Sequence, residues 1–211
     1  APRDRPALSP SALGGEKALS PAEGTVAPGR ADALRRGRLV HLLLEHLPNV
    51  PPPAWRDAAP GIAALEAPDV SLAELADALA EAEAVLTAPA LAHVFAPGTL
   101  AEVELCGPGE VLGRPLLGAI DRLIVAPDRV LAVDFKTNAE VAATAEDVPE
   151  GILRQMGAYA GMLEAIYPGR PVETAILWSR TAQLMPLPRA LTSAALARAA
   201  ADGDGTVAGA A

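Results

Sequence analysis

The chain has 211 residues, a length that suits one sizeable domain or one domain with tails. Its 17 basic and 26 acidic residues give a net charge of −9, which excludes a histone-like protein that binds nucleic acid through its overall charge. The single cysteine, Cys106, excludes a disulfide framework, a cysteine-based zinc site and an iron–sulfur cluster.

The chain carries no signal for a membrane or for export. No apolar run reaches the length of a membrane span, and residues 1–4 lack both an initiator methionine and the apolar core of a signal peptide. We therefore expect a cytoplasmic protein with no membrane partner, and a start of this kind is compatible with a fragment of a longer chain.

The first third of the chain is expected to be a tail followed by helices. Residues 1–30 are rich in Pro, Gly, Ser and Ala without periodicity, which is typical of a linker or tail. Apolar residues at helical spacing predict a helix over 31–47, and the proline run at 51–53 ends it. The next helix begins at Ser71, which forms an S-x-x-E capping box with Glu74.

The rest of the chain alternates between strands and helices. Strands are predicted at 101–106, 115–125, 130–136, 172–178 and 183–187, and helices from Pro89 to Val94, at 149–166 and at 191–201. Three strands joined by short links favour an antiparallel meander, and the helix before the fourth strand favours a right-handed parallel crossover. We expect an α/β fold with a small mixed sheet flanked by helices.

The hairpin between the second and third strands brings two carboxylates together. If Val125 pairs with Val130 across the four-residue turn, Asp121 lies directly opposite Asp134. Lys136 is two residues further on and points to the same face. Two facing carboxylates on a half-buried strand pair repel each other. Protonation of one carboxyl, a neutralising lysine or a bound divalent cation would offset this repulsion. Oxygen ligands of this kind suit Mg²⁺ or Mn²⁺.

A simpler alternative for these residues remains open. Asp121 could pair with Arg122 or Arg129 at the surface, while Asp134 and Lys136 form a solvated edge. The apolar residues around the D-x-K sequence, and the fact that the chain has only two lysines, favour a functional site.

Three segments resemble motifs of the RecB-type branch of the PD-(D/E)XK nucleases. These are residues 118–123 (GAIDRL), residues 133–138 (VDFKTN) and the pair Gln155-x-x-x-Tyr159. The resemblance is strongest to the C-terminal nuclease domain of AddA, the helicase–nuclease subunit of bacterial AddAB complexes. Further similar segments are 37–45, 101–103 and 166–170, so that the resemblance runs from about residue 31 to residue 188.

The resemblance implies a restriction-endonuclease-like fold and a metal site. The catalytic residues would be Asp121, Asp134 and Lys136. The metal ligands would be His41, Glu102, Asp121, Asp134 and the backbone carbonyl of Phe135. Glu104 stands where the family usually has proline, which leaves open which of the two glutamates faces the metal, and we favour Glu102. From the residues alone, His41 could equally be a structural histidine of its helix.

The resemblance also implies contacts to DNA. The implied DNA-binding residues are Arg38, Thr137, Asn138, Gln155 and Tyr159. Gln155 and Tyr159 are four residues apart and share a helix face, where they could contact DNA or simply form a polar rim on a core helix.

The function implied is that of a Mg²⁺- or Mn²⁺-dependent (exo)deoxyribonuclease domain at residues 31–190, followed by a C-terminal helix and frayed tail at 191–211. Its context would be an ATP-dependent helicase–nuclease in double-strand break repair by recombination. The expected partners are a single-stranded DNA end, the helicase portion of the same full-length chain and an AddB-type subunit. No P-loop motif occurs, so the ATPase motor is absent from these residues. The alternatives are a catalytically silent nuclease-like module for DNA binding or subunit docking, and an unrelated α/β interaction domain.

Overall fold

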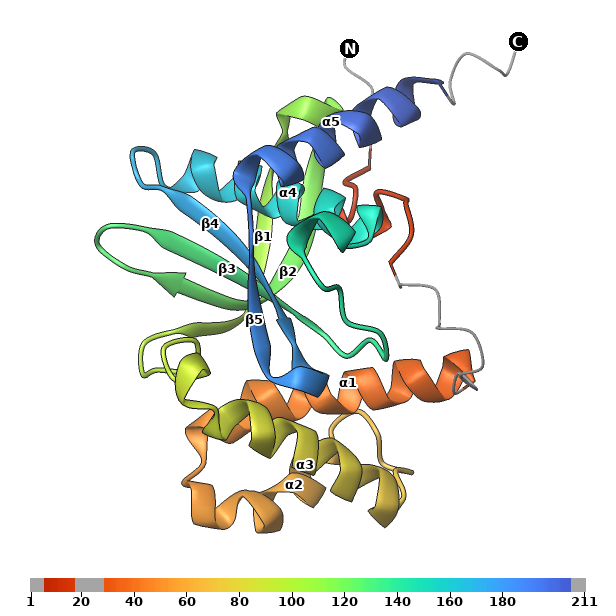
Figure 1. Ribbon diagram of the computed structural model, residues 1–211, viewed down its shortest axis with the longest axis vertical. Coiled ribbons are helices and arrows are strands. Elements are labelled where there is room, and N and C mark those ends of the chain that lie inside the picture. The colour runs from red at the N-terminus through yellow and green to blue at the C-terminus, as the bar shows by residue number, and fades with distance from the viewer. Residues whose placement is uncertain (1–5, 18–28, 206–211) are drawn as a thin grey trace.

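The structure, a computed structural model, describes residues 6–17 and 29–205 (Figure 1). The parts of the predicted tails at 1–5, 18–28 and 206–211 lie outside the described residues. Within the described ranges, no helix is both long enough and apolar enough to cross a membrane. The helices are α1 (Arg30–His46), α2 (Trp55–Ala63), α3 (Leu72–Thr87), α4 (Glu150–Ile166) and α5 (Arg189–Gly205), and the strands are β1 (Leu100–Gly109), β2 (Arg114–Val125), β3 (Val130–Lys136), β4 (Val172–Trp178) and β5 (Gln183–Leu187).

The strands form one mixed sheet in the order β1-β2-β3-β4-β5. Only the β3–β4 pair in this sheet is parallel, and α4 connects its two strands, which confirms the predicted meander and crossover. The predicted hairpin register is also confirmed, because Val125 pairs with Val130 and Arg122 pairs with Val133.

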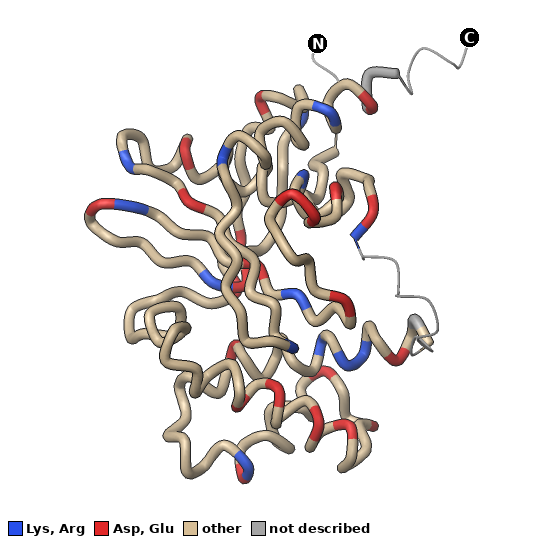
Figure 2. Tube along the Cα trace, viewed as in Figure 1, with Lys and Arg blue, Asp and Glu red and all other residues tan. Residues whose placement is uncertain are grey.

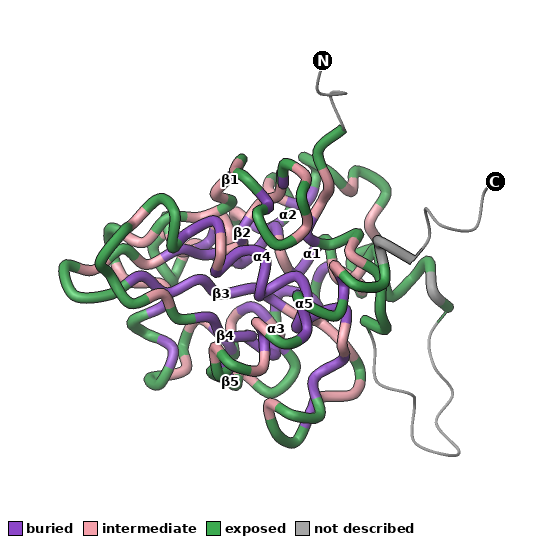
Figure 3. The backbone as a smooth tube through the Cα atoms, turned by 90° about the horizontal axis from the view of Figure 1, so that it is seen from above, coloured by how far each residue is buried: buried purple, intermediate pink, exposed green. Residues whose placement is uncertain are grey.

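Helices cover both faces of the sheet. α4 and α5 pack on one face, and α1, α2 and α3 pack on the other (Figure 1). Strand β3 serves both cores, since Val130 and Ala132 face the α4 side while Leu131, Val133 and Phe135 face the α1 side. Figure 3 shows the buried backbone concentrated in the middle of the molecule, where the strands run between the two helical layers.

The helical layer on the α1 side contains an element that the sequence analysis did not assign. Helix α2 follows the proline run, and its first residue, Trp55, is buried. The indole N–H of Trp55 contacts the carbonyl oxygens of Leu47 at 3.0 Å and Val50 at 2.9 Å, which ties the helix to the end of α1. The helix predicted from Pro89 is a single 3₁₀ turn, whereas the capping box of Ser71 is present as predicted.

The N-terminal arm, which we define as residues 6–17, lies along the sheet. The backbone N–H of Leu8 donates to the carbonyl of Pro115 at 2.8 Å, and the N–H of Leu117 donates to the carbonyl of Leu8 at 3.0 Å. Pro10 is buried. This part of the predicted linker or tail therefore contacts the outer part of β2.

Candidate metal centre

Asp121 marks the point where strands β2 and β3 stop pairing. The backbone pairs run as far as Arg122 and Val133. At the next position the side chain of Asp121 accepts a hydrogen bond from the backbone N–H of Phe135 at 2.5 Å. The carboxylate thus replaces a backbone acceptor, and this fixes its orientation at the end of the hairpin.

His41 reaches the same carboxylate from helix α1. Its Nδ1 lies 3.3 Å from Oδ1 of Asp121, and its ring packs edge-on against Phe135 with the centroids 5.7 Å apart. Burial opposes the charged form of each partner. The hydrogen bond between them nevertheless lowers the pKa of Asp121 and raises the pKa of His41. The pair is therefore an imidazole and an ionised carboxylate held in contact.

Glu102 approaches from strand β1 in an unusual backbone conformation. Its neighbours pair with β2 as Ala101 with Arg122 and Val103 with Ile120, which places Glu102 opposite Asp121. The φ of Glu102 is 46°, a left-handed value that is uncommon outside glycine and is found mainly where function requires it. Burial, together with the negative charges of Asp121 and Glu45, raises the pKa of Glu102 to about 7.

These three side chains form a group that suits a metal ion. Within the described part of the chain, one ligand atom from each of His41, Glu102 and Asp121 lies within 4.8 Å of the other two. One imidazole nitrogen and two carboxylate oxygens are a donor set that hard divalent cations accept. Partial desolvation and, after it, the negative charge of Asp121 raise the pKa of Glu102, and a bound cation would offset both effects. Glu104 is not a member of this group.

Asp134 lies beside the group but is held by other partners. It is almost completely buried, and its Oδ1 accepts a hydrogen bond from the side-chain amide of Gln155 at 2.8 Å. Its Oδ2 contacts the ammonium of Lys136. Burial raises the pKa of Asp134, against the effect of Lys136, and the charge of Asp121 adds to the rise. The two aspartates are thus close enough to influence each other, as the register predicts.

Gln155 and Tyr159, which are predicted to bind DNA, lie inside the protein. Both side chains are buried in α4 rather than exposed in a cleft. Gln155 also donates to the hydroxyl of Tyr159 at 3.2 Å, and that hydroxyl donates to the carbonyl of Ala119 at 2.5 Å. Their polar atoms therefore bridge α4 to β2 and to Asp134, and their contact with DNA stays a prediction.

The other residues predicted to bind DNA line a cavity that His41 and Glu102 of the metal group also line. This cavity has a volume of about 570 Å³, and its walls include His41, Glu102, Phe135 and Lys136. Arg38, Thr137 and Asn138 also line it. The ring of Phe135 packs against His41 and its backbone N–H donates to Asp121. Neither contact involves its backbone carbonyl, so the predicted role of that carbonyl as a metal ligand stays a proposal.

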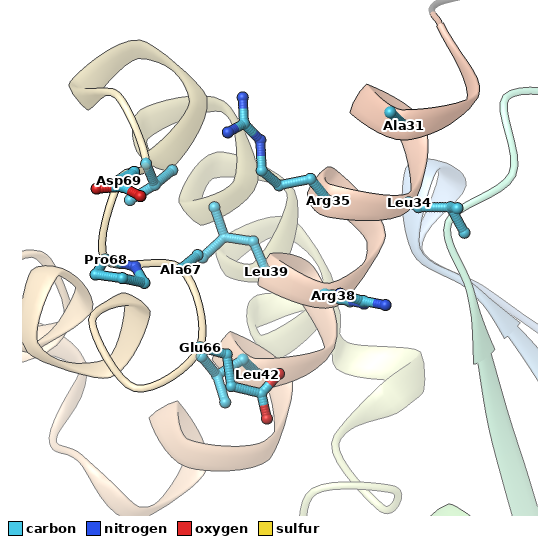
Figure 4. Close-up of a pocket in the computed structure, with 11 residues that line it drawn as sticks. Ala31, Leu34, Arg35, Arg38, Leu39, Leu42, Glu66, Ala67, Pro68 and Asp69 are labelled. Carbon is cyan, nitrogen blue, oxygen red and sulfur yellow. The ribbon is translucent and has the colours of Figure 1, made fainter.

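A second cavity, of about 340 Å³, adjoins the first (Figure 4). Arg38 and Glu66 line both cavities. Figure 4 shows Arg35 and Arg38 pointing to different sides of α1, and Arg35 forms an ion pair with Glu74 at 2.7 Å. Figure 2 shows that basic positions cluster on α1, whereas the acidic ones are spread over several elements.

The sequence analysis missed a polar network at the end of β3. Oγ of Ser179 lies 2.5 Å from Oε1 of Glu81 and 3.1 Å from the carbonyl oxygen of Lys136. Glu81 also contacts the guanidinium of Arg36. The network joins α1, α3, the end of β4 and the end of β3. These segments are distant in the sequence, so no local sequence pattern predicts the contacts between them.

Arg122 is a second residue that the site uses and that the sequence analysis left open. The structure buries it instead of pairing it with Asp121 at the surface. Its guanidinium donates to the carbonyl of Leu44 at 2.8 Å and lies 5.1 Å from the ring centroid of Phe95. Because Leu44 is one turn beyond His41, this bond fixes α1 against the strand that carries Asp121.

A comparison with known protein families matches most of the chain. A family model described as the PD-(D/E)XK nuclease superfamily matches residues 16–202. A search of curated proteins gives no match. Solved structures that match include one described as the crystal structure of SSO0001, with 18% sequence identity and a TM-score of 0.37, covering 79% of this chain and 74% of that chain.

Proposed function

The chain belongs to the PD-(D/E)XK nuclease superfamily, and from this we propose that it hydrolyses phosphodiester bonds of DNA with a divalent metal, Mg²⁺ or Mn²⁺. The observation that carries the proposal is the group of His41, Glu102 and Asp121, of which His41 and Glu102 line one cavity with Lys136. Members of this superfamily use divalent metals, and the donor set fits such an ion.

Each side chain has a distinct task in this proposal. His41, Glu102 and Asp121 would hold the metal, which when bound supplies positive charge to the scissile phosphate and activates water. Lys136 would orient the attacking water or neutralise charge that develops on the phosphate. Asp134 would keep Lys136 in place through their ion pair, at the edge of the metal site.

The finer assignment follows the sequence resemblance. We propose that the chain belongs to the AddA or RecB-like branch and acts as an exonuclease on a single-stranded DNA end. In that setting a helicase portion and an AddB-type subunit would deliver the DNA for recombinational repair in the cytoplasm. The order and spacing of the GAIDRL, VDFKTN and Gln155-x-x-x-Tyr159 motifs, together with the hydrogen bond from Gln155 to Asp134, support this assignment. No base-reading element is apparent in the sequence, so we expect little sequence preference.

The proposal is tested by measuring cleavage and metal binding in parallel. The wild-type protein should cleave end-labelled single-stranded DNA with Mn²⁺ or Mg²⁺, and the metal should stabilise it by about 2.7 kcal/mol at a hundredfold excess over Kd. Asp121→Asn should lose both effects. Lys136→Ala should keep the metal effect and lose cleavage. Asp128→Asn, an exposed residue of the β2–β3 turn, is the matched control.

Two outcomes would contradict the proposal. Metal binding without cleavage in the wild type would indicate the silent module instead of an enzyme. If the metal stabilises the wild type and Asp121→Asn equally, the assignment of the metal centre is wrong.

A further inference from the structure

The N-terminal arm is fastened to the first turn of helix α4. The backbone N–H of Gly151 donates to the carbonyl of Glu16 at 2.7 Å. The guanidinium of Arg154 donates to the carbonyl of Leu13 at 3.2 Å. A side chain at position 151 would lie 2.7 Å from the carbonyl oxygen of Glu16 and 2.8 Å from that of Gly15, so the contact requires glycine. The family match begins only at residue 16, so most of the arm precedes it.

The last described residue of the arm, Lys17, meets the segment that follows the catalytic strand. The side-chain amide of Asn138 donates to the backbone carbonyl of Lys17 at 3.0 Å. Asn138 lines the metal cavity two residues after Lys136. The end of the arm therefore lies at the rim of this cavity. It is held there through the backbone carbonyl of Lys17, so the Lys17 side chain takes no part in this attachment.

We propose that Lys17 is a second phosphate-binding residue, which contacts a backbone phosphate of the DNA strand next to the phosphate at the metal centre. The inference rests on the proposed function, since it assumes that a DNA strand enters the cavity. The ammonium of Lys17 contacts the carbonyl of Ser11, and this uses one of its three N–H donors. The others are available to a phosphate, and the residue is exposed.

The charge distribution supports an anion at this position. The chain has only two lysines and a net charge of −9, yet both lysines lie at the same rim. Partial burial and the positive charge of Lys136 lower the pKa of Lys17, and the carboxylate of Asp134 offsets only part of this. A phosphate bound near both ammonium groups would offset their repulsion, because it is attracted to both.

The first experiment measures binding of a fluorescent single-stranded oligonucleotide without divalent metal, so that no cleavage takes place. Removing one phosphate contact should reduce the slope of log K against log salt by about 0.7 and weaken binding about fivefold at 0.1 M salt. Lys17→Ala should show this change and Lys17→Arg should not. Arg56→Ala removes one charge from an exposed position on α2, with a side chain 83% exposed, and should match the wild type.

The second experiment moves the arm without changing any charge. Gly151→Ala forces the arm away from α4 and should weaken oligonucleotide binding as Lys17→Ala does. Gly161→Ala lies in the same helix and its added methyl group meets nothing within 4 Å, so it should bind like the wild type. In a Gly151→Ala background, Lys17→Ala should cause little further loss.

Wild-type affinity and salt slope in Lys17→Ala would overturn the proposal, as would a wild type that does not bind the oligonucleotide. A failure of the proposed function looks different. In that case the wild type would bind DNA through Lys17 and yet leave it uncut when Mn²⁺ or Mg²⁺ is added.

Discussion

The side-chain amide of Gln155 donates a hydrogen bond to Oδ1 of Asp134 at 2.8 Å, and both side chains are almost completely buried. A buried carboxylate needs partners, because water is not present to solvate it. Asp134 has two, the amide of Gln155 and the ammonium of Lys136. Helix α4 therefore supports the acidic end of β3 from behind, on the face opposite α1.

Removing the amide should destabilise the protein. Gln155→Leu leaves Asp134 with one partner in a buried place, and we expect a loss of about 1–3 kcal/mol in the free energy of unfolding together with a loss of cleavage. Gln183, the only other glutamine, is exposed on β5, and Gln183→Leu should stay within about 0.5 kcal/mol of the wild type. Urea unfolding measures both. Equal unfolding midpoints would show that the buried bond does not support Asp134.

The strands of the sheet can be predicted from the sequence because short local patterns define them. Strands β3, β4 and β5 were predicted with their observed bounds, since turns and prolines delimit their apolar runs. The register of the β2–β3 hairpin follows from a short turn at residues 126–129, and it places the two aspartates together without any information from the rest of the fold.

Other features depend on contacts between distant segments, and these left no local pattern. Helix α2 contains Pro60 and follows a proline run, so its sequence argues against a helix that packing against α1 nevertheless stabilises. The spacing of Gln155 and Tyr159 predicts a shared helix face but does not say whether that face meets solvent or the sheet. The left-handed conformation of Glu102 is equally invisible in the sequence, because strand patterns assume extended backbone.

The metal centre predicts an unusual dependence of stability on pH. Glu102 has a pKa of about 7 in the folded protein, against an ordinary value of 4.5, chiefly because its carboxyl group is partly desolvated although the residue as a whole is exposed. The folded state therefore binds more protons than the unfolded state between these two values, and stability falls as the pH rises through that window. The raised pKa values of Asp134 and His41 act in the same direction, since each also favours the protonated form in the folded protein.

Urea unfolding in a chelator from about pH 5 to pH 8 measures this dependence. The wild type should lose stability over this range, and Glu102→Gln should lose less because it has no proton to release. Glu104→Gln, two residues along the same strand and outside the metal group, should follow the wild type. Added Mn²⁺ should reverse the trend, since it binds the deprotonated ligands. Parallel curves for all three proteins would contradict the raised pKa of Glu102.

The network behind Lys136 should control the position of its backbone. Oγ of Ser179 has one proton and lies near two acceptors, Oε1 of Glu81 at 2.5 Å and the carbonyl oxygen of Lys136 at 3.1 Å. Ser179→Ala removes this link from a buried place, and we expect a loss of about 1–3 kcal/mol in unfolding free energy. Cleavage should fall as well, because Lys136 is no longer fixed where its strand ends. Thr181→Val, which removes an exposed hydroxyl two residues away, is the control.

A double-mutant cycle separates this role from a simple loss of packing. If Ser179 and Glu81 act together on Lys136, the unfolding free energies and the cleavage rates of Ser179→Ala and Glu81→Gln should be non-additive, with a coupling of about 0.5–3 kcal/mol. Arg36, which contacts Glu81 from α1, should join this coupling, since removing it leaves the glutamate without its counter-charge. Additive effects on cleavage would mean that the two residues stabilise the fold independently and do not position the lysine.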